Sequence, residues 1–495
     1  MNHIGVLFAS GLAISSQVCS AQNAQKIIDS YLRASGGQKA LARIQTASIA
    51  GSLAEESTGK TGSYSMVTQA PNHFYLEIIA GPDRIVEAYN GMSAWSQDGA
   101  QGVHTLMGDA EKEVEGAARY WSNRLVDLRK AKLGVQLVGK ETVRDHEAYH
   151  LRLLLDSGIT HEVFIDSSTF LMIREASPGH SLRLDYDDYR PVNGIETPQR
   201  IELHLGDRVY EISVTRAEFN SAVENSTFDI PRPRDTVSGL PDIKSLILEV
   251  AKNQKAIEEM ARQYTCHVKE EEQKRDSKGH VTSTKINEYE SYTVAGDEIR
   301  RLVAKDGKPL TDDQKKKEDD RFNKEYDKQL KKKAQIDADL QKQQKAQEKD
   351  QAEISDFLRA VRFSNMRREQ FRGQEVIAVD FGPNPAYKPK KMIENVIQKL
   401  MGVVWIDEHA RDVVRLEGHF SDSAKFGGGI LGSIDKGSSF VFEQAKVNNE
   451  VWLPVYAEVH VGARLLLLKA HANEIDRYSD YKKFHADSKI VSVNE

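Results

Sequence analysis

Residues 146–150 read HEAYH and match the pattern H-E-x-x-H. On a helix, the two histidines of this pattern hold a zinc ion and the glutamate acts as the general base of a metalloprotease. One hypothesis is therefore a zinc hydrolase that uses His146, Glu147 and His150. The hypothesis requires a helix, because residues four apart on a strand lie ~13 Å from each other, whereas zinc–nitrogen bonds are only ~2.0–2.1 Å long.

The residues around this motif favour a strand. If residues 147–155 form a strand, Tyr149, Leu151, Leu153 and Leu155 fall on one face of it, which is the period of a half-buried strand. On a strand His146 and His150 point to the wetter face of a sheet and cannot share one ion. We therefore expect no metal site and no catalytic residue here, and the zinc hydrolase is the weakest of three hypotheses.

Two further motifs and one pair of residues are also interpreted as structural. The segment AEESTGKT (54–61) resembles a phosphate-binding loop, but the next residues alternate like a strand, which predicts a hairpin turn. The segment GGGILG (427–432) lacks a surrounding βαβ unit. Cys266 and His267 are adjacent, which does not place a base against a thiol, and no nucleophile elbow occurs. We expect a protein without enzymatic activity and without a cofactor.

Composition limits the class of protein further. The 495 residues include 68 basic and 74 acidic side chains, for a net charge of −6, which argues against a nucleic-acid-binding protein. Residues 1–21 read as a secretory signal peptide, with lipidation of Cys19 as the competing interpretation. No later stretch has the ~18–20 apolar residues of a membrane span. The expected location is the periplasm, where the single remaining cysteine, Cys266, allows no intramolecular disulfide.

The same sequence pattern occurs twice. KETVRDHEAYHLRL (140–153) aligns without a gap to REQFRGQEVIAVDF (368–381), and VFIDSSTFLMIR (163–174) aligns to VWIDEHARDVVR (404–415). Because the matches keep their order along the chain, a duplicated domain explains them better than chance does.

Each copy contains helices with an apolar stripe among strand-like runs. The first copy opens with a helix around Gln25–Arg33 that stops at Gly36-Gly37. Apolar residues at helical spacing then predict a middle helix in the first copy and a second stripe in the other copy. The stripes are Val114, Ala118, Trp121, Leu125 and Leu128, and Ile393, Val396, Ile397 and Leu400.

A long charged segment interrupts the second copy. Residues Asp312–Asp350 contain neither glycine nor proline, and acidic residues precede lysines at four-residue spacing. This pattern predicts a solvated helix that serves as a spacer. A partner-binding coiled coil is the alternative, although apolar a and d positions are not sustained.

The repeated unit resembles the LolA/LolB-like superfamily of lipoprotein carriers and receptors. The resemblance rests on GGQKAL, APNHFYLEI, YNGMSAW and the run from GKETVRDHEAYHLRL to TFDIP. It implies an α+β fold in which two tandem, unclosed antiparallel β-barrels each pack on helices. The expected domains are residues 22–231 and 242–487, joined by a linker at 232–241, with the charged helical insertion at about 311–360.

The resemblance also implies a cavity that takes acyl chains beneath a lid formed by the two stripes, which otherwise belong to the core. The leading hypothesis is an exported, non-enzymatic protein that binds a lipid, an acylated lipoprotein or another apolar ligand. The second is a structural or regulatory protein whose filled half-barrels bind envelope proteins. We expect neither a nucleic-acid partner nor a transmembrane span.

Overall fold

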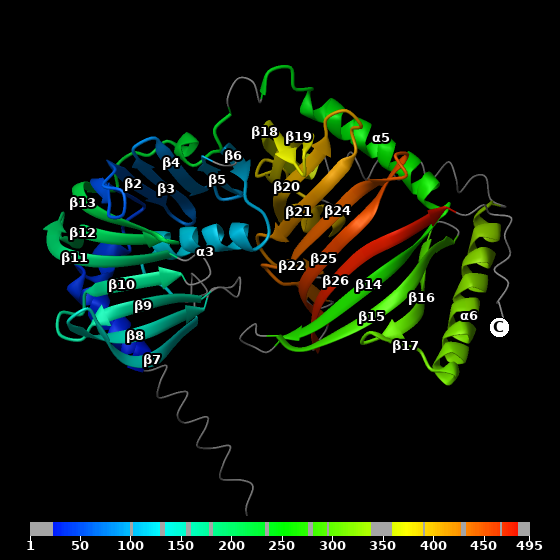
Figure 1. The fold of residues 1–495 in the computed structure, drawn as a ribbon, viewed down its shortest axis with the longest axis horizontal. Coiled ribbons are helices and arrows are strands. Elements are labelled where there is room, and N and C mark those ends of the chain that lie inside the picture. The colour runs from blue at the N-terminus through cyan, green and yellow to red at the C-terminus, as the bar shows by residue number, and fades with distance from the viewer. Residues whose placement is uncertain are drawn as a thin grey trace, which may run out of the picture. The chain divides into compact units, whose positions relative to one another are not determined.

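The computed structural model divides into two compact units, Met1–Pro231 and Arg232–Glu495. Each unit is built around one antiparallel sheet (Figure 1). The predicted signal peptide and residues 427–431 of the glycine-rich loop lie outside the described part of the chain. The structure describes residues 23–99, 102–128, 134–154, 160–177, 182–232, 237–275, 281–294, 297–337, 359–389, 392–426, 432–465 and 468–483.

Unit 1 contains a 13-stranded sheet with the order β6-β5-β4-β3-β2-β1-β13-β12-β11-β10-β9-β8-β7. The first strand lies in the middle, and β6 and β7 form the two edges without pairing, so the barrel is unclosed. The strands are β1 (Thr46–Glu55), β2 (Thr61–Gln69), β3 (His73–Ala80), β4 (Asp83–Tyr89), β5 (Ala94–Asp98), β6 (Gly102–Thr105), β7 (Gly134–Val143), β8 (His146–Leu154), β9 (Thr160–Asp166), β10 (Met172–Ser177), β11 (Leu182–Val192), β12 (Ile195–Leu205) and β13 (Arg208–Phe219).

The apolar face of this sheet encloses the core of unit 1. Strand β3 alternates between buried and half-buried residues along its whole length, as expected when one face of an antiparallel sheet packs on the core. The predicted first helix forms over residues 23–34. Its residues Ala24, Ile28 and Leu32 are buried in the same cluster as Leu151 and Leu203 of the sheet, so helix and strands share one core.

The phosphate-loop match is a hairpin, as predicted, because residues 54–61 connect β1 to β2 and these strands pair with each other. The HEAYH motif lies at the start of β8, which confirms the strand prediction. No helix of the described residues is long and apolar enough to cross a membrane.

The sheet of unit 2 follows the same plan, with β14 in the middle and the order β17-β16-β15-β14-β26-β25-β24-β21-β20-β19-β18. The short strands β22 and β23 pair with each other beside β25. The strands are β14 (Tyr264–Arg275), β15 (Val281–Val294), β16 (Asp297–Lys305), β17 (Lys308–Pro309), β18 (Val361–Phe371), β19 (Gln374–Pro383), β20 (Leu400–Asp407), β21 (Val413–Phe420), β22 (Ala424–Phe426), β23 (Gly432–Ile434), β24 (Ser439–Val447), β25 (Val451–Leu465) and β26 (Leu468–Lys483). The repeated order agrees with a duplication.

The first helix of unit 2, α5 (Ile243–Ala261), corresponds to helix 23–34 of unit 1. Asp242 caps its start by accepting a hydrogen bond from the backbone N–H of Ser245 at 3.0 Å. Leu246 of α5 is buried against Ile377, Val379 and other residues of β19 and β20. The helix therefore covers one part of the apolar face of the second sheet.

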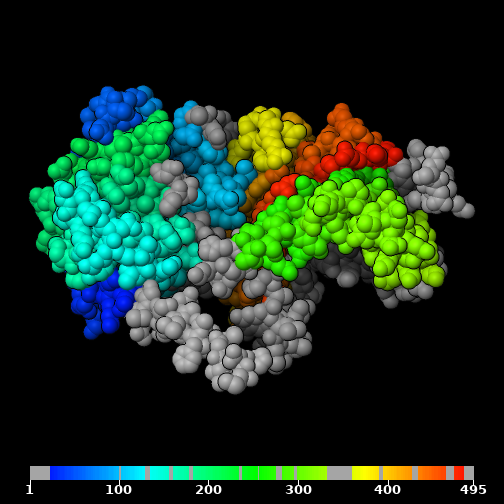
Figure 2. Space-filling view, turned by 60° about the horizontal axis from the view of Figure 1, so that its bottom comes forward, coloured from blue at the N-terminus to red at the C-terminus, as the bar shows by residue number. Residues whose placement is uncertain are grey.

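The charged segment forms α6 (Asp312–Asp337), which confirms a helix there; the rest of the predicted helix, to Asp350, lies outside the described residues. Most of its described side chains are exposed, and Figure 2 shows its yellow-green surface beside the green strands of the same unit. Phe322 is buried against Val294 and Ile299. Because α6 follows the edge strand β17 and precedes the edge strand β18, it occupies the place in the chain that the middle helix has in unit 1.

The glycine that ends the first helix gives a test of this architecture. Gly36 has φ +120°, and a Cβ there would lie 2.3 Å from the carbonyl oxygen of Gly194 in the β11–β12 turn. Gly37 has φ +94° but no atom within 4 Å of such a Cβ. We expect Gly37→Ala to lower the free energy of unfolding by about 1–2 kcal/mol through backbone strain alone, and Gly36→Ala by about 3 kcal/mol or more because it adds a clash. Urea unfolding of both variants measures the difference, and equal losses would contradict it.

Candidate ligand-binding interior of unit 1

The middle helix α3 (Asp109–Asn123) connects the two edge strands of unit 1, β6 and β7. Its backbone lies closest to β2, β3, β4 and β5, so it crosses the open sheet on the side of its first strands. Asp109 and Glu111 lie in its first turn, where negative charge is favourable to the helix dipole. The helix is therefore a bridge between edges that do not pair with each other.

The predicted stripe on α3 is buried in the core. Val114, Ala118 and Trp121 have exposed fractions of 1%, 0% and 8%. Leu125 is also buried but lies beyond the helix, and Leu128 packs half-buried against the same cluster. The prediction of one continuous helical stripe was therefore wrong at its end. The helix stops at Asn123 because Arg124 and Leu125 both adopt left-handed backbone conformations.

The second predicted stripe is not a counterpart of α3. The helix there, α8 (Met392–Ile397), is short and lies between β19 and β20, whereas α3 lies between sheet edges. Val396 and Ile397 are half-buried, and the side chain of Ile393 lies outside the described residues. Leu400 belongs to the stripe in sequence but is the first residue of β20. The helical spacing of these residues is thus interrupted by a turn and a strand.

A buried carboxylate on β10 lies beneath α3. Glu175 is 2% exposed. Tyr120 donates a hydrogen bond to it at 2.7 Å and the indole of Trp121 donates another at 2.8 Å. Tyr186 of β11 also donates to Glu175, and Nε2 of His161 on β9 lies 3.4 Å from it. We name Glu175, Tyr120, Trp121, His161 and Tyr186 the polar hub, because it joins the helix to three strands.

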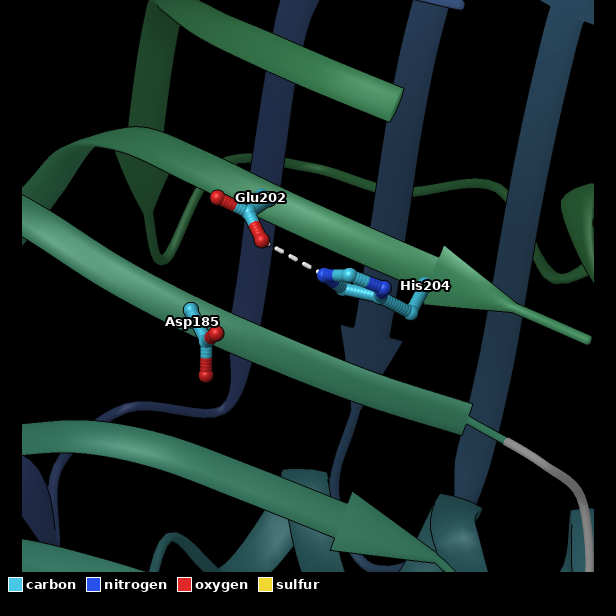
Figure 3. Close-up of side chains that lie close together, drawn as sticks. All are labelled: Asp185, Glu202 and His204. Carbon is cyan, nitrogen blue, oxygen red and sulfur yellow. Dashed lines mark hydrogen bonds and ion pairs between the residues drawn. The ribbon is translucent and has the colours of Figure 1, made fainter. Parts of the chain in front are cut away.

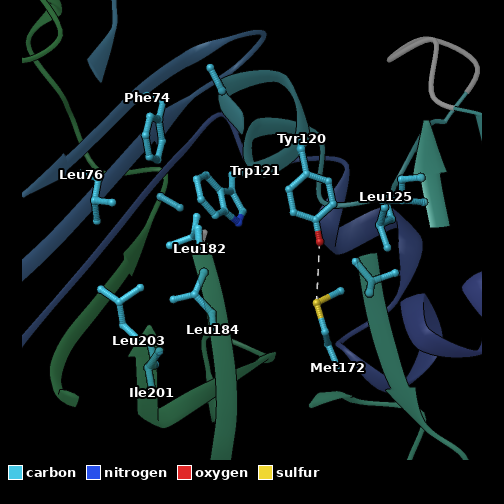
Figure 4. Packing of buried hydrophobic residues seen from close by; sticks show 14 of the residues in the cluster. Phe74, Leu76, Tyr120, Trp121, Leu125, Met172, Leu182, Leu184, Ile201 and Leu203 are labelled. Carbon is cyan, nitrogen blue, oxygen red and sulfur yellow. Dashed lines mark hydrogen bonds between the residues drawn. The ribbon is translucent and has the colours of Figure 1, made fainter. Parts of the chain in front are cut away.

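Apolar groups surround the polar hub. The ring of Trp121 stacks on Phe74 of β3, with centroids 4.9 Å apart and an interplanar angle of 25°. Figure 4 shows Trp121 among Phe74, Leu76, Leu182 and other aliphatic residues, with Tyr120 pointing towards Met172. One end of each aromatic side chain is thus in an apolar environment while its N–H or O–H reaches Glu175, the arrangement that buried Trp and Tyr require.

The hydrogen bonds outweigh the cost of burial at Glu175. Burial alone raises the pKa of this carboxyl, but hydrogen bonds and charge from His161, together with those from Tyr186 and Tyr120, hold the pKa below its usual value. Burial, followed by the nearby carboxylate, raises the pKa of Tyr120 well above 10. Glu175 is therefore an ionised acceptor at neutral pH, and the tyrosine remains a neutral donor.

The end of α3 carries a second polar attachment. Arg124 donates a hydrogen bond to the hydroxyl of Thr68 on β2 at 2.9 Å. Burial lowers the pKa of its guanidinium to about 10. A positive charge at a helix C-terminus is favourable to the dipole, so Arg124 stabilises the end of α3 against the sheet.

The HEAYH residues do not converge on a common point. Nδ1 of His146 lies 2.9 Å from Asp166. The two ring nitrogens of His150 each lie 2.6 Å from a carboxylate, of Glu141 and of Glu162. His150 lies on the face of β8 opposite to Leu151 and Leu153, as predicted, but it is only 8% exposed and its ring stacks on Phe164. Neighbouring carboxylates and an aromatic ring bury it on the outer face.

A cluster of possible metal ligands on β11 and β12 is already charge-compensated. Figure 3 shows Asp185, Glu202 and His204 close together. Arg174 and Arg183 pair with Asp185, while Arg183 also pairs with Glu202. Glu202 has a further ion pair, at 3.2 Å, with the arginine at position 144. Three guanidinium groups thus supply the positive charge that a metal ion would bring.

Of the five residues of the polar hub, only Trp121 was predicted from the sequence as a site residue. His161 alternates with Val163 and Ile165 on β9, so the period of the strand was sufficient to place its side chain in the interior. Glu175 gave no such signal, because an irregularity in the pairing between Met172 and Arg174 shifts the alternation of β10. Met172 and Glu175 both contact Tyr120 although their odd spacing predicts opposite faces.

Comparisons with known proteins give no family assignment. No family model matches the sequence, and no curated protein matches it. Among solved structures, a LolA superfamily protein from Nitrosomonas europaea is 14% identical, covers 41% of this chain and 96% of its own, and has a TM-score of 0.28. A DUF1329 family protein from Desulfovibrio piger is 12% identical, with 42% and 97% coverage and a TM-score of 0.29. The MucA/MucB complex of Pseudomonas aeruginosa is 9% identical, with 93% and 99% coverage and a TM-score of 0.16. These scores are too low to transfer a ligand or a residue role.

Removing the charge of the hub tests its contribution to stability. We expect Glu175→Gln to lower the free energy of unfolding at pH 7 by about 2–4 kcal/mol, because it weakens several buried hydrogen bonds to a carboxylate. The folded-state pKa of Glu175 is lowered, so its stabilisation is present above the unfolded pKa of about 4.3 and is lost as the pH falls through the folded value. Urea unfolding at pH 7 and at decreasing pH should show the gap between wild type and variant narrowing in acid. A gap that widens in acid would contradict this assignment.

The strand geometry of HEAYH leads to a separate expectation. Glu147 is exposed and pairs with Lys140 at 2.7 Å, and no zinc can be shared by the two histidines. We expect metal analysis of the purified protein to find no zinc bound by His146 and His150, and Glu147→Gln to leave folding intact. One tightly held zinc per chain that is lost in a His146→Ala variant would contradict the strand interpretation.

Proposed function

We propose that the protein is an exported, non-enzymatic binding protein for an apolar ligand, and that unit 1 holds an acyl chain between its sheet and α3. The observation that supports this proposal is the position of α3, which bridges two unpaired edges and presents an apolar stripe to the interior. A helix that covers an open sheet in this way can be displaced without breaking any pairing between strands. Lipids and acylated lipoproteins are the proposed ligand classes, and the periplasm is the proposed location.

The energetics favour exchange of helix for ligand. Each methylene group of an acyl chain costs about 0.8 kcal/mol in water, so a diacyl lipid gains on the order of 20 kcal/mol from a sheltered site. The stripe of α3 already buries apolar side chains against the same sheet, so an acyl chain that takes their place preserves most of the apolar contact. When the ligand is released, the hydrogen bonds of the polar hub define the position to which the helix returns.

We also propose that the two domains differ in whether they hold an acyl chain. In the domains proposed, 22–231 and 242–487 with a linker at 232–241, the described residues place an apolar helix between the sheet edges of the first domain only. The corresponding helix of the second, α6, is largely exposed and charged. We propose that the second domain does not contain a second acyl site of this design.

The exposed helix supports a second candidate function, the binding of an envelope protein. Asp319 of α6 pairs with Arg301 of β16 at 2.6 Å, and Glu318 accepts a hydrogen bond from the backbone N–H of Leu302. These contacts fix the inner side of the helix to the sheet and leave its charged outer side accessible. In this alternative the half-barrels are filled scaffolds and bind no lipid.

Quenching by a brominated fatty acid distinguishes the two functions. Trp121 lies at the proposed site, whereas Trp452 is buried in unit 2 and its indole nitrogen has no hydrogen-bond partner among the described residues. We expect 9,10-dibromostearate to quench the tryptophan fluorescence of the wild type and of Trp452→Phe, because bromine atoms next to Trp121 quench its emission. Quenching should be much weaker in Trp121→Phe.

Two outcomes would reject the acyl site. Saturable quenching that is equal in all three proteins would place the fatty acid elsewhere. No uptake of dibromostearate, together with organic extracts of the purified protein that contain no lipid by mass spectrometry, would favour the envelope-protein alternative. Direct measurement of dibromostearate uptake by Trp121→Phe separates loss of the reporter from loss of binding.

A further inference from the structure

The inner face of unit 2 contains a group of carboxylates on strands from opposite ends of its sequence. Glu270 of β14 is directly opposite Asp476 of β26, and Glu474 lies two residues before Asp476 on the same face. Each of the three offers an oxygen within 4.8 Å of the others. Opposed residues of an antiparallel pair point to the same side of the sheet, so the three carboxylates form one cluster.

Strand register connects this cluster to the apolar face on which α5 packs. The pairing continues from Asp476 to Ala457, from Ala457 to Phe442 and from Phe442 to Leu416. Leu416 packs on the core cluster that contains Leu246 of α5. The carboxylates therefore lie on the same face as the apolar core of unit 2, at the centre of the sheet.

Two buried oxygen atoms in this cluster have no hydrogen-bond partner among the described residues. Asp476 is 4% exposed; its Oδ2 accepts a hydrogen bond from Arg300 at 2.7 Å, but its Oδ1 has no partner. Asn287 of β15 is 3% exposed, and its amide nitrogen donates to Glu270 at 2.9 Å while its Oδ1 has no partner. Buried acceptors without donors are rare in folded proteins and point to a group that is bound there.

The charges around the cluster are not balanced. Among the described residues, one arginine, Arg300, accompanies the carboxylates of this cluster, and it contacts Glu270, Glu298 and Asp476 but not Glu474. The nearby Glu272 is already paired with a lysine at 3.6 Å. A bound cation would remove the excess of negative charge.

We propose that Glu270, Glu474 and Asp476 bind a calcium ion on the inner face of unit 2, with Oδ1 of Asn287 as a fourth ligand. The donor set consists of oxygen atoms, which suit hard cations and not zinc or copper. Calcium accepts irregular arrangements of carboxylate and amide oxygens, whereas magnesium requires near-ideal octahedral geometry and retains its water. Four ligands from three strands fit calcium better.

The site has an approach from solvent. A pocket of about 380 Å³ opens between α6 and the strands β14–β16, and Glu270, Glu298 and Arg300 are among the residues that line it. Glu318 and Arg321 of α6, also in its wall, neutralise each other in an ion pair. A cation that enters this pocket therefore meets the unbalanced carboxylates at its inner side.

Calorimetric titration of the full-length protein, freed of metal with EDTA, tests the site. We expect calcium chloride to bind with a dissociation constant of about 10⁻⁴–10⁻³ M, as in weak calcium modules, and to raise the melting temperature. Glu474→Gln should weaken binding at least tenfold, because it removes a ligand that has no hydrogen bond among the described residues. Glu202→Gln is the matched control, in the cluster that arginines compensate, and should bind calcium as the wild type does.

A second variant, which should respond more strongly to calcium than the wild type does, shows whether weaker binding results only from a folding defect. Asn287→Asp adds a fourth carboxylate, so we expect a lower melting temperature in EDTA and a larger rise on addition of calcium. The proposal is overturned if the wild type binds no calcium, if Glu202→Gln loses as much affinity as Glu474→Gln, or if magnesium chloride binds as tightly as calcium chloride. A purely structural carboxylate cluster would not reverse the effect of Asn287→Asp between EDTA and calcium.

Discussion

An open, curled sheet must bury its inner face although its two edge strands do not pair with each other. In unit 1 the thirteen strands run from β6 to β7 without closure, and their inner side chains form the largest described core cluster. Closing such a sheet by pairing would remove the exposed edges, but here a chain segment has to cross from one edge to the other. The position of α3, its apolar stripe and the hub beneath it all follow from that constraint.

The constraint explains why a buried carboxylate is tolerated in an otherwise apolar interior. A helix held by apolar contacts alone can slide or rotate, since such contacts are not directional. Glu175 fixes its position, because Tyr120 and Trp121 are adjacent on the helix and both donate to the same side chain. Tyr186 and His161 satisfy the remaining acceptor capacity of Glu175. Its carboxylate therefore does not carry the large energetic penalty of an unpaired buried charge. The polar hub thus fixes one position of α3 on the sheet.

Regular strand alternation was enough to predict much of the fold from sequence. The alternation of Tyr149, Leu151 and Leu153 identified β8 and excluded a zinc ion shared by the two histidines. The order of the repeats predicted two domains of the same plan, and the two sheets share one strand order. Prediction failed where tertiary contacts override a period. Leu125 continues a helical spacing after the helix has ended, Leu400 continues one within a strand, and the irregular pairing of β10 concealed Glu175.

The two units show that one topology can enclose interiors of different chemistry. At the centre of the first sheet β1 and β13 place Leu53 opposite Ile212, both buried in the apolar core. At the centre of the second, β14 and β26 place Glu270 opposite Asp476. Backbone pairing is the same in both cases, so the sheet does not dictate what its inner face accommodates. An apolar pair favours an apolar helix or an acyl chain as its cover, whereas a carboxylate pair requires compensating positive charge, which Arg300 supplies only in part. Two sheets with the same strand order can therefore carry different inner side chains, because the order depends on the backbone pairing of every strand with its neighbours.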